Sequence, residues 1–349
     1  MNDAAVAPTG AESISLSQLA DAVRRELHVD DLTPVTVTEQ AEFSNINYVY
    51  RVELQDRSLY LKVVPERPRN FPVNVPRERV YSEAAGLRRF HELADDIIVI
   101  PEVLFVDSQL MTLAMSDVGQ GRQVLFPILA QRFDLLAELA DSLGWALAAI
   151  HRGTLGEGSM RPPPEEYIVR KIIFDGLLGP GAQLAIPELW PQINAEMQSH
   201  RECLVHGDLW SKNLLVKQGA AVAVVDFEGV HYGDPAFDLG TLAAVALLPA
   251  VEDEGLVFAA LDFIARLLHA WKTACGSEIW WQQVSSRVLT ATAVFLATRG
   301  FGPFAYKMTP AAQGRLLRLV RSLAAEPPVD LDNFASRVKQ FIGPSTSME

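Results

Sequence analysis

Cysteine is scarce in this chain: Cys203 and Cys275 are the only two, they lie far apart, and their positions match no metal-binding spacing. No disulfide framework is therefore expected, and a reducing cytoplasm is the expected compartment. Residues 1–10 lack a basic segment followed by an apolar core, so no secretory signal is predicted. The longest apolar run, residues 239–251, is shorter than the ~20 residues that span a bilayer, and we predict a buried helix there.

Positive charge is also in deficit, because 30 Lys and Arg residues stand against 43 Asp and Glu residues, for a net charge of −13. This balance argues against a nucleic-acid-binding surface and against docking on anionic lipid. A chain that is 49% apolar and 21% charged is typical of a soluble globular protein. Its 349 residues exceed one typical core, so two lobes are expected, in a monomer or a homodimer.

Two polar segments carry the pattern from which a function is predicted. Residues 204–213 have the sequence Leu-Val-His-Gly-Asp-Leu-Trp-Ser-Lys-Asn, and residues 225–229 have Val-Asp-Phe-Glu-Gly. Phosphoryl transfer from ATP needs an Asp that orients the acceptor hydroxyl, then an Asn and a second Asp that hold Mg²⁺ against the triphosphate. Asp208, Asn213 and Asp226 supply these residue types in this order. The pattern predicts a phosphotransferase that acts on a small-molecule substrate, with ATP and Mg²⁺ as cofactors.

The residues between the two segments support this prediction. Residues 214–217 form one predicted strand and residues 221–225 a buried return strand, with a turn at 218–219. Such a hairpin would bring Asn213 and Asp226 to the same edge. An Asp-Gly turn with an unrelated buried Asp would leave both the spacing and the hairpin unexplained.

A site of this kind also needs a strand lysine, paired with a helix glutamate, to hold the α- and β-phosphates. Lys62 lies among apolar β-forming residues in the predicted strand 58–64, and Glu83 lies in the predicted helix 77–93. Glu78, in the same helix, is the competing partner. Each residue alone would be typical of a solvated surface, and the downstream motif favours the functional interpretation.

Glycine is missing where a phosphate-covering loop is expected, between the first two strands. Residues 42–50 occupy that place and contain none. Asn tolerates left-handed backbone conformations, and small polar side chains can donate to phosphate. Ser44, Asn45 and Asn47 are therefore the candidate phosphate ligands of this loop, although an ordinary polar hairpin has the same composition.

Two different periodicities divide the chain. Before residue 116 we predict β-forming runs at 35–39, 48–54, 58–64, 97–100, 103–107 and 110–115, together with helices at 15–28 and 77–93. From residue 133 onward the apolar residues recur with helical spacing, and a single long apolar face extends over 133–150. The pattern predicts an α+β, bilobal protein-kinase-like fold, with a small β-rich N-lobe and a large, mostly helical C-lobe.

The expected divisions are a helix and disordered start in 1–29, the N-lobe in 30–115, the C-lobe in 116–342 and a disordered tail in 343–349. A connector at 113–119 would place the backbone of Met115 beside the adenine, with ATP in the cleft between the lobes. Two further polar residues are expected to be structural. Asp238 is predicted either to cap a helix or to accept hydrogen bonds from the catalytic loop, and His151 to be a buried hydrogen-bonding histidine.

Over roughly residues 40–305, these motifs resemble those of the aminoglycoside phosphotransferase and choline kinase-like superfamily of small-molecule kinases. Within it the nearest resemblance is to 5-methylthioribose kinase, which has a loop similar to 45–52, an Arg-rich helix start like 77–83, and Asp-x-Glu in place of Asp-Phe-Gly. The resemblance implies phosphorylation of a hydroxyl of a sugar-like metabolite. It also implies that Glu228 is a second metal-binding carboxylate.

Two departures leave the acceptor open. Methylthioribose kinases usually lack the Asn that stands here as Asn213, and they tend to carry an Arg pair near the substrate where this chain has only Arg299. Residues 206–210 are also similar to the fructosamine kinase form of the motif. An aminoglycoside or other antibiotic acceptor is the alternative, although 252–254 is the only tight acidic cluster in the C-lobe. A nucleotide-binding pseudokinase is the alternative of another class, and the joint presence of the Lys, the two Asp and the Asn weighs against it.

Overall fold

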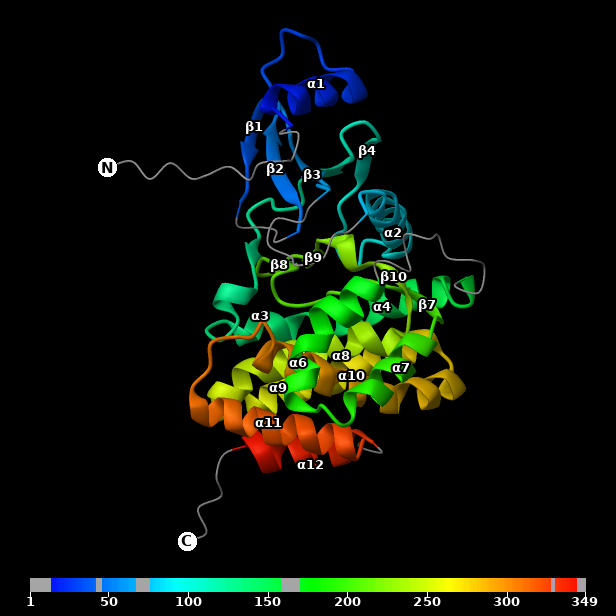
Figure 1. Ribbon diagram of the computed structural model, residues 1–349, viewed down its shortest axis with the longest axis vertical. Coiled ribbons are helices and arrows are strands. Elements are labelled where there is room, and N and C mark those ends of the chain that lie inside the picture. Colours follow the sequence, from blue (N-terminus) through cyan, green and yellow to red (C-terminus); the bar gives the residue numbers. More distant parts are fainter. Residues whose placement is uncertain (1–13, 42–45, 67–75, 158–169, 328–329, 344–349) are drawn as a thin grey trace, which may run out of the picture.

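The computed structural model describes residues 14–41, 46–66, 76–157, 170–327 and 330–343. A small lobe built around an antiparallel sheet stands on a larger, mostly helical lobe (Figure 1). The predicted α+β architecture is thereby confirmed. The elements that position the cleft come from both lobes.

The sheet of the small lobe has five antiparallel strands in the order β1-β2-β3-β5-β4. Their bounds are β1 Thr36–Glu39, β2 Tyr48–Glu53, β3 Ser58–Val63, β4 Val103–Asp107 and β5 Thr112–Ser116. Helix α1 (Leu16–Leu27) begins at a capping box made by Ser15 and Gln18, and it buries Leu19 and Val23 against the sheet. Residues 97–100 do not form the predicted strand. Only Val99 pairs, as an isolated bridge with Ala223, because in the described part of the chain no strand lies beside the other three residues.

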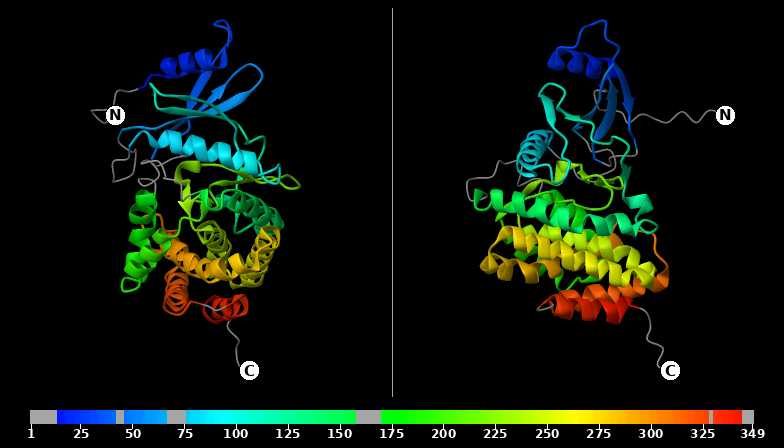
Figure 2. Two further views of the ribbon diagram at one scale, coloured as in Figure 1. Left: turned by 90° about the vertical axis from the view of Figure 1, so that its right-hand side faces the viewer. Right: turned by 180° about the vertical axis from the view of Figure 1, so that it is seen from behind.

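Helix α2 (Arg79–Leu93) lies between the sheet and the helical lobe (Figure 2). It contacts β4 and β5 above, and helix α4 and the short helix η4 (Phe227–Gly229) below. The face toward the protein carries buried Val80, Glu83, Ala84, Leu87 and Phe90. A buried glutamate among apolar residues indicates a specific partner across the cleft.

The helical lobe is a stack of long helices. Helix α4 (Ala140–Gly153) packs on α9 (Val257–Cys275), α8 (Pro235–Glu252) lies against both α9 and α10 (Glu278–Phe301), and α10 packs on α11 (Pro310–Ala325). The remaining elements are α3 (Phe133–Glu138), α6 (Gly179–Ala185), α7 (Trp190–Ser199), α12 (Leu331–Ile342), the 3-10 turns η1 (Phe126–Ile128) and η5 (Glu254–Leu256), and a π-helix, η3 (Ile172–Leu178). The apolar face predicted over 133–150 is divided between α3 and α4, which are separated at Leu139.

Helix α8 contains the apolar run that was predicted to be a buried helix, and the structure confirms this. Among the described residues it is the one helix long and apolar enough to cross a membrane, but 89% of it is buried inside the protein. It is therefore the core helix of the lobe. Above it lie two small ribbons, β7 (Cys203–Val205) with β10 (His231–Gly233), and β6 (Gln123–Val124) with β8 (Leu214–Val216) and β9 (Ala223–Val224).

Candidate active site

Asp208 lies on a loop that is held in place by Asp238, near the start of α8. The Asp238 carboxylate accepts hydrogen bonds from the backbone N–H groups of His206 at 2.8 Å and Gly207 at 3.0 Å. The cap of α8 is instead Asp234, whose side chain accepts from the backbone N–H two residues on. Of its two predicted roles, Asp238 therefore has that of fixing the loop.

A chain of buried side chains continues from Asp238 into the helical core. Trp271 donates from Nε1 to His151 Nδ1 at 3.0 Å, so the ring proton of His151 lies on Nε2, 3.3 Å from the Asp238 carboxylate. Burial raises the pKa of Asp238, but the hydrogen bonds from His151 and from the loop outweigh it, and the pKa lies below its ordinary value. His151 has the predicted role of a buried hydrogen-bonding residue.

Gly207 allows this loop to approach the second motif. Its φ is +80°, and a Cβ atom placed there would lie 2.1 Å from the carbonyl oxygen of Gly229. A side chain is thus excluded both by backbone conformation and by space. The ring of His206 adds a direct link between the motifs, since its Nε2 lies 3.1 Å from the carbonyl oxygen of Val225.

The Asp208 carboxylate is partly buried, and its side chain is 19% exposed. Arg299, near the end of α10, holds Nη2 at 3.3 Å from Asp208 Oδ1, and Asn213 donates from Nδ2 to the other carboxylate oxygen at 3.2 Å. Burial raises the pKa of Asp208 to about 6, with the Arg299 charge acting in the opposite direction. The group is therefore ionised at neutral pH, yet basic enough to accept a proton.

The predicted hairpin brings Asn213 and Asp226 together. Strands β8 and β9 pair, and the backbone N–H of Val225 donates to the carbonyl oxygen of Asn213 at 3.0 Å. Asp226 then adopts a left-handed conformation with φ of 65°, which turns the chain into η4 and places Glu228 on the same side of the cleft. Asp and Asn are among the residues that tolerate this conformation.

Lys62, on β3 of the small lobe, forms ion pairs with carboxylates of both lobes. Its ammonium group donates to Glu83 at 2.7 Å and to Asp226 at 2.5 Å, and it lies 3.3 Å from Glu228. Burial lowers the pKa of Lys62, but these carboxylates more than offset it, and the pKa lies above its ordinary value. The predicted contact with Glu83 is confirmed, whereas Glu78 is exposed at the start of α2.

Glu228 is the carboxylate of this group that lies farthest from the Lys62 ammonium, at 3.3 Å. Burial and then the nearby charge of Asp226 raise its pKa to about 7. Asn47 donates from Nδ2 to Glu228 at 2.5 Å, and Arg79 donates from Nη2 to Asn47 at 2.5 Å. Of the three predicted loop residues, Asn47 is thus buried against Glu228, while Ser44 and Asn45 lie outside the described residues.

A cavity of about 570 Å³ lies between the lobes and contains the site. Of the residues predicted from the sequence, its lining includes Lys62, Glu83, Met115, Asp208, Asn213, Asp226, Glu228 and Arg299. Sequence reasoning missed Arg79, which also lines the cavity. Its signal was the spacing of one helical turn before Glu83, which puts both side chains on one face of α2.

Beside Asp208 the wall of the cavity is aromatic and carries cations. The guanidinium carbon of Arg299 lies 3.7 Å from the centroid of the Trp210 ring, and Tyr306 stacks near the same ring at 6.2 Å. The ammonium of Lys212 lies 5.0 Å from Trp210 and 5.3 Å from Phe126. This arrangement was also missed, because Phe126 and Tyr306 come from segments that only the fold brings to the motif.

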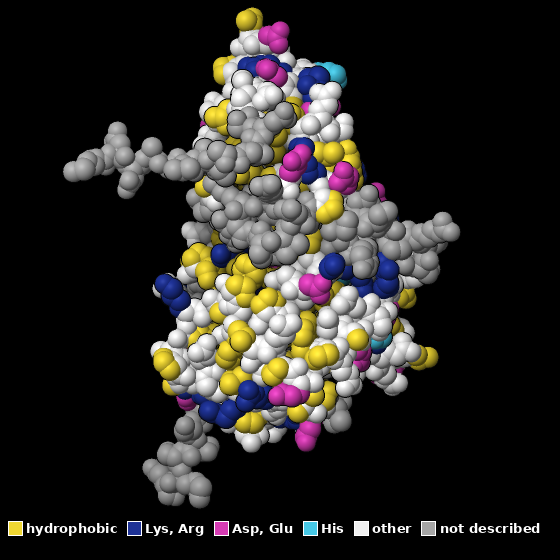
Figure 3. Space-filling view, viewed as in Figure 1, with side chains coloured by type: hydrophobic (Ala, Val, Ile, Leu, Met, Phe, Trp, Pro, Cys, Tyr) yellow, Lys and Arg dark blue, Asp and Glu magenta, His cyan; other side chains and the backbone are white. Residues whose placement is uncertain are grey.

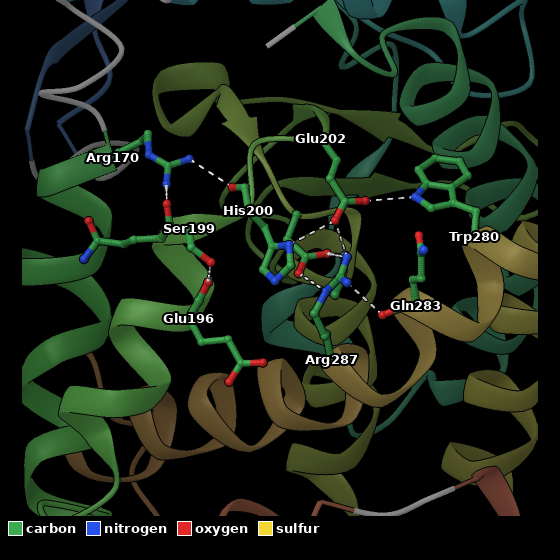
Figure 4. Close-up of polar contacts among 11 residues, drawn as sticks. Arg170, Glu196, Ser199, His200, Glu202, Trp280, Gln283 and Arg287 are labelled. Atoms are coloured by element: carbon green, nitrogen blue, oxygen red, sulfur yellow. Dashed lines mark hydrogen bonds and ion pairs between the residues drawn. The ribbon is translucent and has the colours of Figure 1, made fainter. Parts of the chain in front are cut away.

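A second polar cluster lies away from the cavity, where β7, α8 and α10 meet (Figure 4). His200, Glu202 and Asp234 have potential ligand atoms within 4.8 Å of one another. Arg287 lies among them and donates to Glu202 and to Asp234, each at 2.5 Å, while Trp280 donates to Glu202 at 2.9 Å. Because the Arg287 guanidinium already neutralises both carboxylates, we interpret the cluster as a structural ion-pair network and not as a metal site.

The bilobal fold and the cleft with its Lys, Asp, Asn and Asp define a kinase-like phosphotransferase. The sequence model of the phosphotransferase enzyme family matches residues 38–274, which is more than half of the chain. The chain therefore belongs to this family, and it is a small-molecule kinase. No curated protein sequence matches it.

Solved structures share the fold. An amicoumacin kinase is 16% identical, with 85% of this chain and 91% of that chain covered and a TM-score of 0.53. A microcompartment-associated aminopropanol kinase is 13% identical, with coverages of 90% and 99% and a TM-score of 0.52. An ethanolamine kinase from Plasmodium vivax is 11% identical, with coverages of 94% and 88% and a TM-score of 0.51. At these identities the likeness is one of fold alone.

Proposed function

We propose that this kinase transfers the terminal phosphate of ATP to a hydroxyl group of a small, sugar-like metabolite, with Asp208 as the catalytic base. The observation that carries the proposal is a partly buried carboxylate, that of Asp208, held by Asn213 and Arg299 in the same cavity as the Lys62–Asp226 ion pair. Phosphoryl transfer has a loose transition state, so catalysis is mainly positioning and charge stabilisation. Asp208 would orient the acceptor hydroxyl and take its proton.

We place the nucleotide between the two lobes. The proposed bounds are residues 30–115 for the N-lobe and 116–342 for the C-lobe. Lys62, oriented by Glu83, would contact the α- and β-phosphates, and the backbone of Met115 would contact the adenine. Ser44, Asn45 and Asn47 would belong to the loop over the phosphates. In support, the structure of the amicoumacin kinase is a complex with the ATP analogue AMP-PNP.

The residues expected to hold Mg²⁺ are Asn213, Asp226 and Glu228. Their fit rests on chemistry and charge: all three offer oxygen atoms, which Mg²⁺ prefers, and three carboxylates surround the single ammonium of Lys62. When bound, the ion would neutralise charge on the phosphates. Lys62 contacts Asp226 and Asn47 contacts Glu228, so both acidic side chains of the cavity wall have a partner within the protein.

We place the acceptor beside Asp208 and Arg299, and the charges around them support a neutral acceptor over a cationic one. The carboxylates of the described cavity lining are Glu83, Asp208, Asp226 and Glu228, and each has a role above. Among the described lining residues a polycation would therefore find no further carboxylate to neutralise its ammonium groups. On the face shown in Figure 3, the described acidic side chains are likewise scattered, without a dense carboxylate patch.

The aromatic surface near the base supports the same conclusion. Aromatic faces attract ammonium groups, but here Arg299 and Lys212 already lie over Trp210. The protein's own cations would repel a cationic acceptor at this surface. A neutral sugar-like compound fits better, with its apolar part near Ile172, Leu177 and Phe304.

The test is a parallel assay of ATP consumption with methylthioribose, other pentoses, choline and kanamycin-like compounds. Turnover of a sugar, with little of the cationic compounds, is the expected result. Lys212→Glu should raise the relative turnover of cationic compounds, whereas Lys217→Glu, exposed on the hairpin beyond the cavity lining, should not. Efficient turnover of an aminoglycoside with none of the sugars accepted would overturn the acceptor class and leave the kinase assignment standing.

A further inference from the structure

Arg79 is a buried cation in the cleft to which the proposed mechanism gives no task. It is the first residue of α2, one turn before Glu83, and only 4% of its surface is exposed. Its Nη2 group donates to Asn47, but among the described residues Nη1 is buried without a hydrogen-bond partner. Arg79 nevertheless lines the cavity.

An unpartnered guanidinium N–H pair is costly to bury, and the great majority of buried donors have an acceptor. Burial lowers the pKa of Arg79, and the charges of Glu228, Glu83 and Asp226 raise it in turn. Those carboxylates contact Lys62, and only Glu228 is linked to Arg79 through an intervening side chain, Asn47. Nη1 is therefore an unsatisfied donor on a residue of the cavity wall, and an acceptor that reaches it would satisfy it.

The position of Arg79 indicates which acceptor this is. It shares a helix face with Glu83, which orients Lys62, and so lies on the nucleotide side of the cavity. Asp208 and Arg299, where the phosphate-accepting compound is placed, belong to the opposite lobe. The anion nearest to Arg79 in a bound complex would be the polyphosphate of the nucleotide.

We propose that Arg79 is a second phosphate-binding cation, which donates from Nη1 to an oxygen of the β- or γ-phosphate while its Nη2 keeps Asn47 and Glu228 oriented. The inference rests on the proposed function, in that it requires the cleft to bind ATP. Arg–phosphate hydrogen bonds are charge-assisted and strong. Arg79 thus selects nucleotides that carry a polyphosphate over those that do not.

Arg77 shows what a structural arginine in this segment looks like. Its Nε donates to the carbonyl oxygen of Val64 at 3.0 Å and its Nη2 to that of Leu110 at 3.1 Å. Arg77 is also outside the cavity lining. The two arginines therefore differ in their hydrogen bonds. The Nε and Nη2 groups of Arg77 donate to backbone carbonyls, whereas the Nη1 group of Arg79 has no acceptor among the described residues.

The experiment compares dissociation constants for ATP, ADP and adenosine by calorimetry in wild type, Arg79→Met, Arg79→Lys and Arg88→Met. Arg88 is an exposed residue of the same helix, so its variant is matched in charge change. Arg79→Met should weaken ATP and ADP at least about tenfold and leave adenosine within about twofold. Arg79→Lys, which keeps the charge but cannot serve Asn47 and a phosphate together, should weaken both less, and Arg88→Met should match wild type.

Two outcomes would overturn the inference while the proposed function stands: equal weakening of all three ligands, which marks a structural role, or no weakening of ATP in either Arg79 variant. If Arg79→Met does not fold, the Arg79→Lys series decides by the same comparison of ATP with adenosine. Wild-type protein that binds no ATP would instead reject the proposed function itself. The two failures are therefore distinguishable in one titration series.

Discussion

Arg299 Nη2 lies 3.3 Å from Asp208 Oδ1, so the proposed catalytic base faces a buried guanidinium. The pair joins the end of α10 to the loop after β7. Burial of the carboxylate favours its protonated form, and the guanidinium favours its ionised form. The balance leaves the pKa of Asp208 at about 6, where a general base operates well near neutral pH.

Replacement of Asp208 by Asn should remove the proton acceptor and preserve the shape of the side chain. Turnover should fall by roughly two to four orders of magnitude, while the affinity for ATP should stay nearly unchanged because the proposed nucleotide contacts come from Lys62 and its neighbours. Steady-state kinetics and nucleotide titration measure the two effects separately. A variant that keeps more than about a tenth of wild-type turnover would remove Asp208 from the role of base.

The pH profile should report the same group. Asp208 must be deprotonated to act, so kcat/KM should fall about tenfold per pH unit below roughly pH 6 and level off above it. Arg299→Gln removes a charge that lowers the pKa of Asp208, so its acid limb should move to higher pH. Arg318→Gln, exposed on α11, is the control and should leave the limb in place. An unmoved limb in Arg299→Gln would contradict the coupling.

The two acidic residues of the Asp-x-Glu segment should differ in their metal dependence. Asp226→Ala should abolish activity at any practical Mg²⁺ concentration, because it removes the carboxylate that contacts both Lys62 and the proposed ion site. Glu228→Ala should retain activity but require more Mg²⁺ or give a lower rate. Titration of Mg²⁺ at saturating ATP measures this, and wild-type behaviour of Glu228→Ala would withdraw that residue from the metal site.

Two glycines with left-handed backbone offer a matched pair of substitutions. At Gly219, φ is +69° and no atom lies within 4 Å of an added Cβ, so Gly219→Ala should cost about 1–2 kcal/mol of backbone strain and leave turnover intact. At Gly207 the added Cβ would meet the Gly229 carbonyl at 2.1 Å. Gly207→Ala should therefore lower Tm further and displace Asp208, with loss of turnover. Equal effects of the two variants would contradict the close approach of the two motifs.

Sequence reasoning was most successful where spacing along the chain fixes the geometry. The hairpin that joins Asn213 to Asp226 is local, and the contact of Lys62 with Glu83 follows from one strand and the next helix. The predicted strand at 97–100 was wrong because residues with β propensity there have no neighbouring strand except at Val99.

The parts that sequence reasoning missed depend on approach between distant segments. Asn47 and Glu228 are 181 residues apart in the chain, and nothing in either local sequence indicates that an amide meets a carboxylate. The same holds for Arg299 over Trp210, which requires the end of α10 to reach the catalytic loop. Arg79 was within reach of sequence analysis by its helical spacing, but its unpartnered group appears only when the burial of each atom is known.

The buried link from Trp271 through His151 to Asp238 couples the catalytic loop to the interior of the large lobe. His151 and Asp238 are fully buried, so the bonds to the His206 and Gly207 amides break only when the helices around them separate. These amides should consequently exchange hydrogen with solvent as slowly as the helix interiors do, although they belong to a loop. Heat inactivation should then coincide with cooperative melting of the lobe, because the loop that carries Asp208 would not unfold locally at a lower temperature.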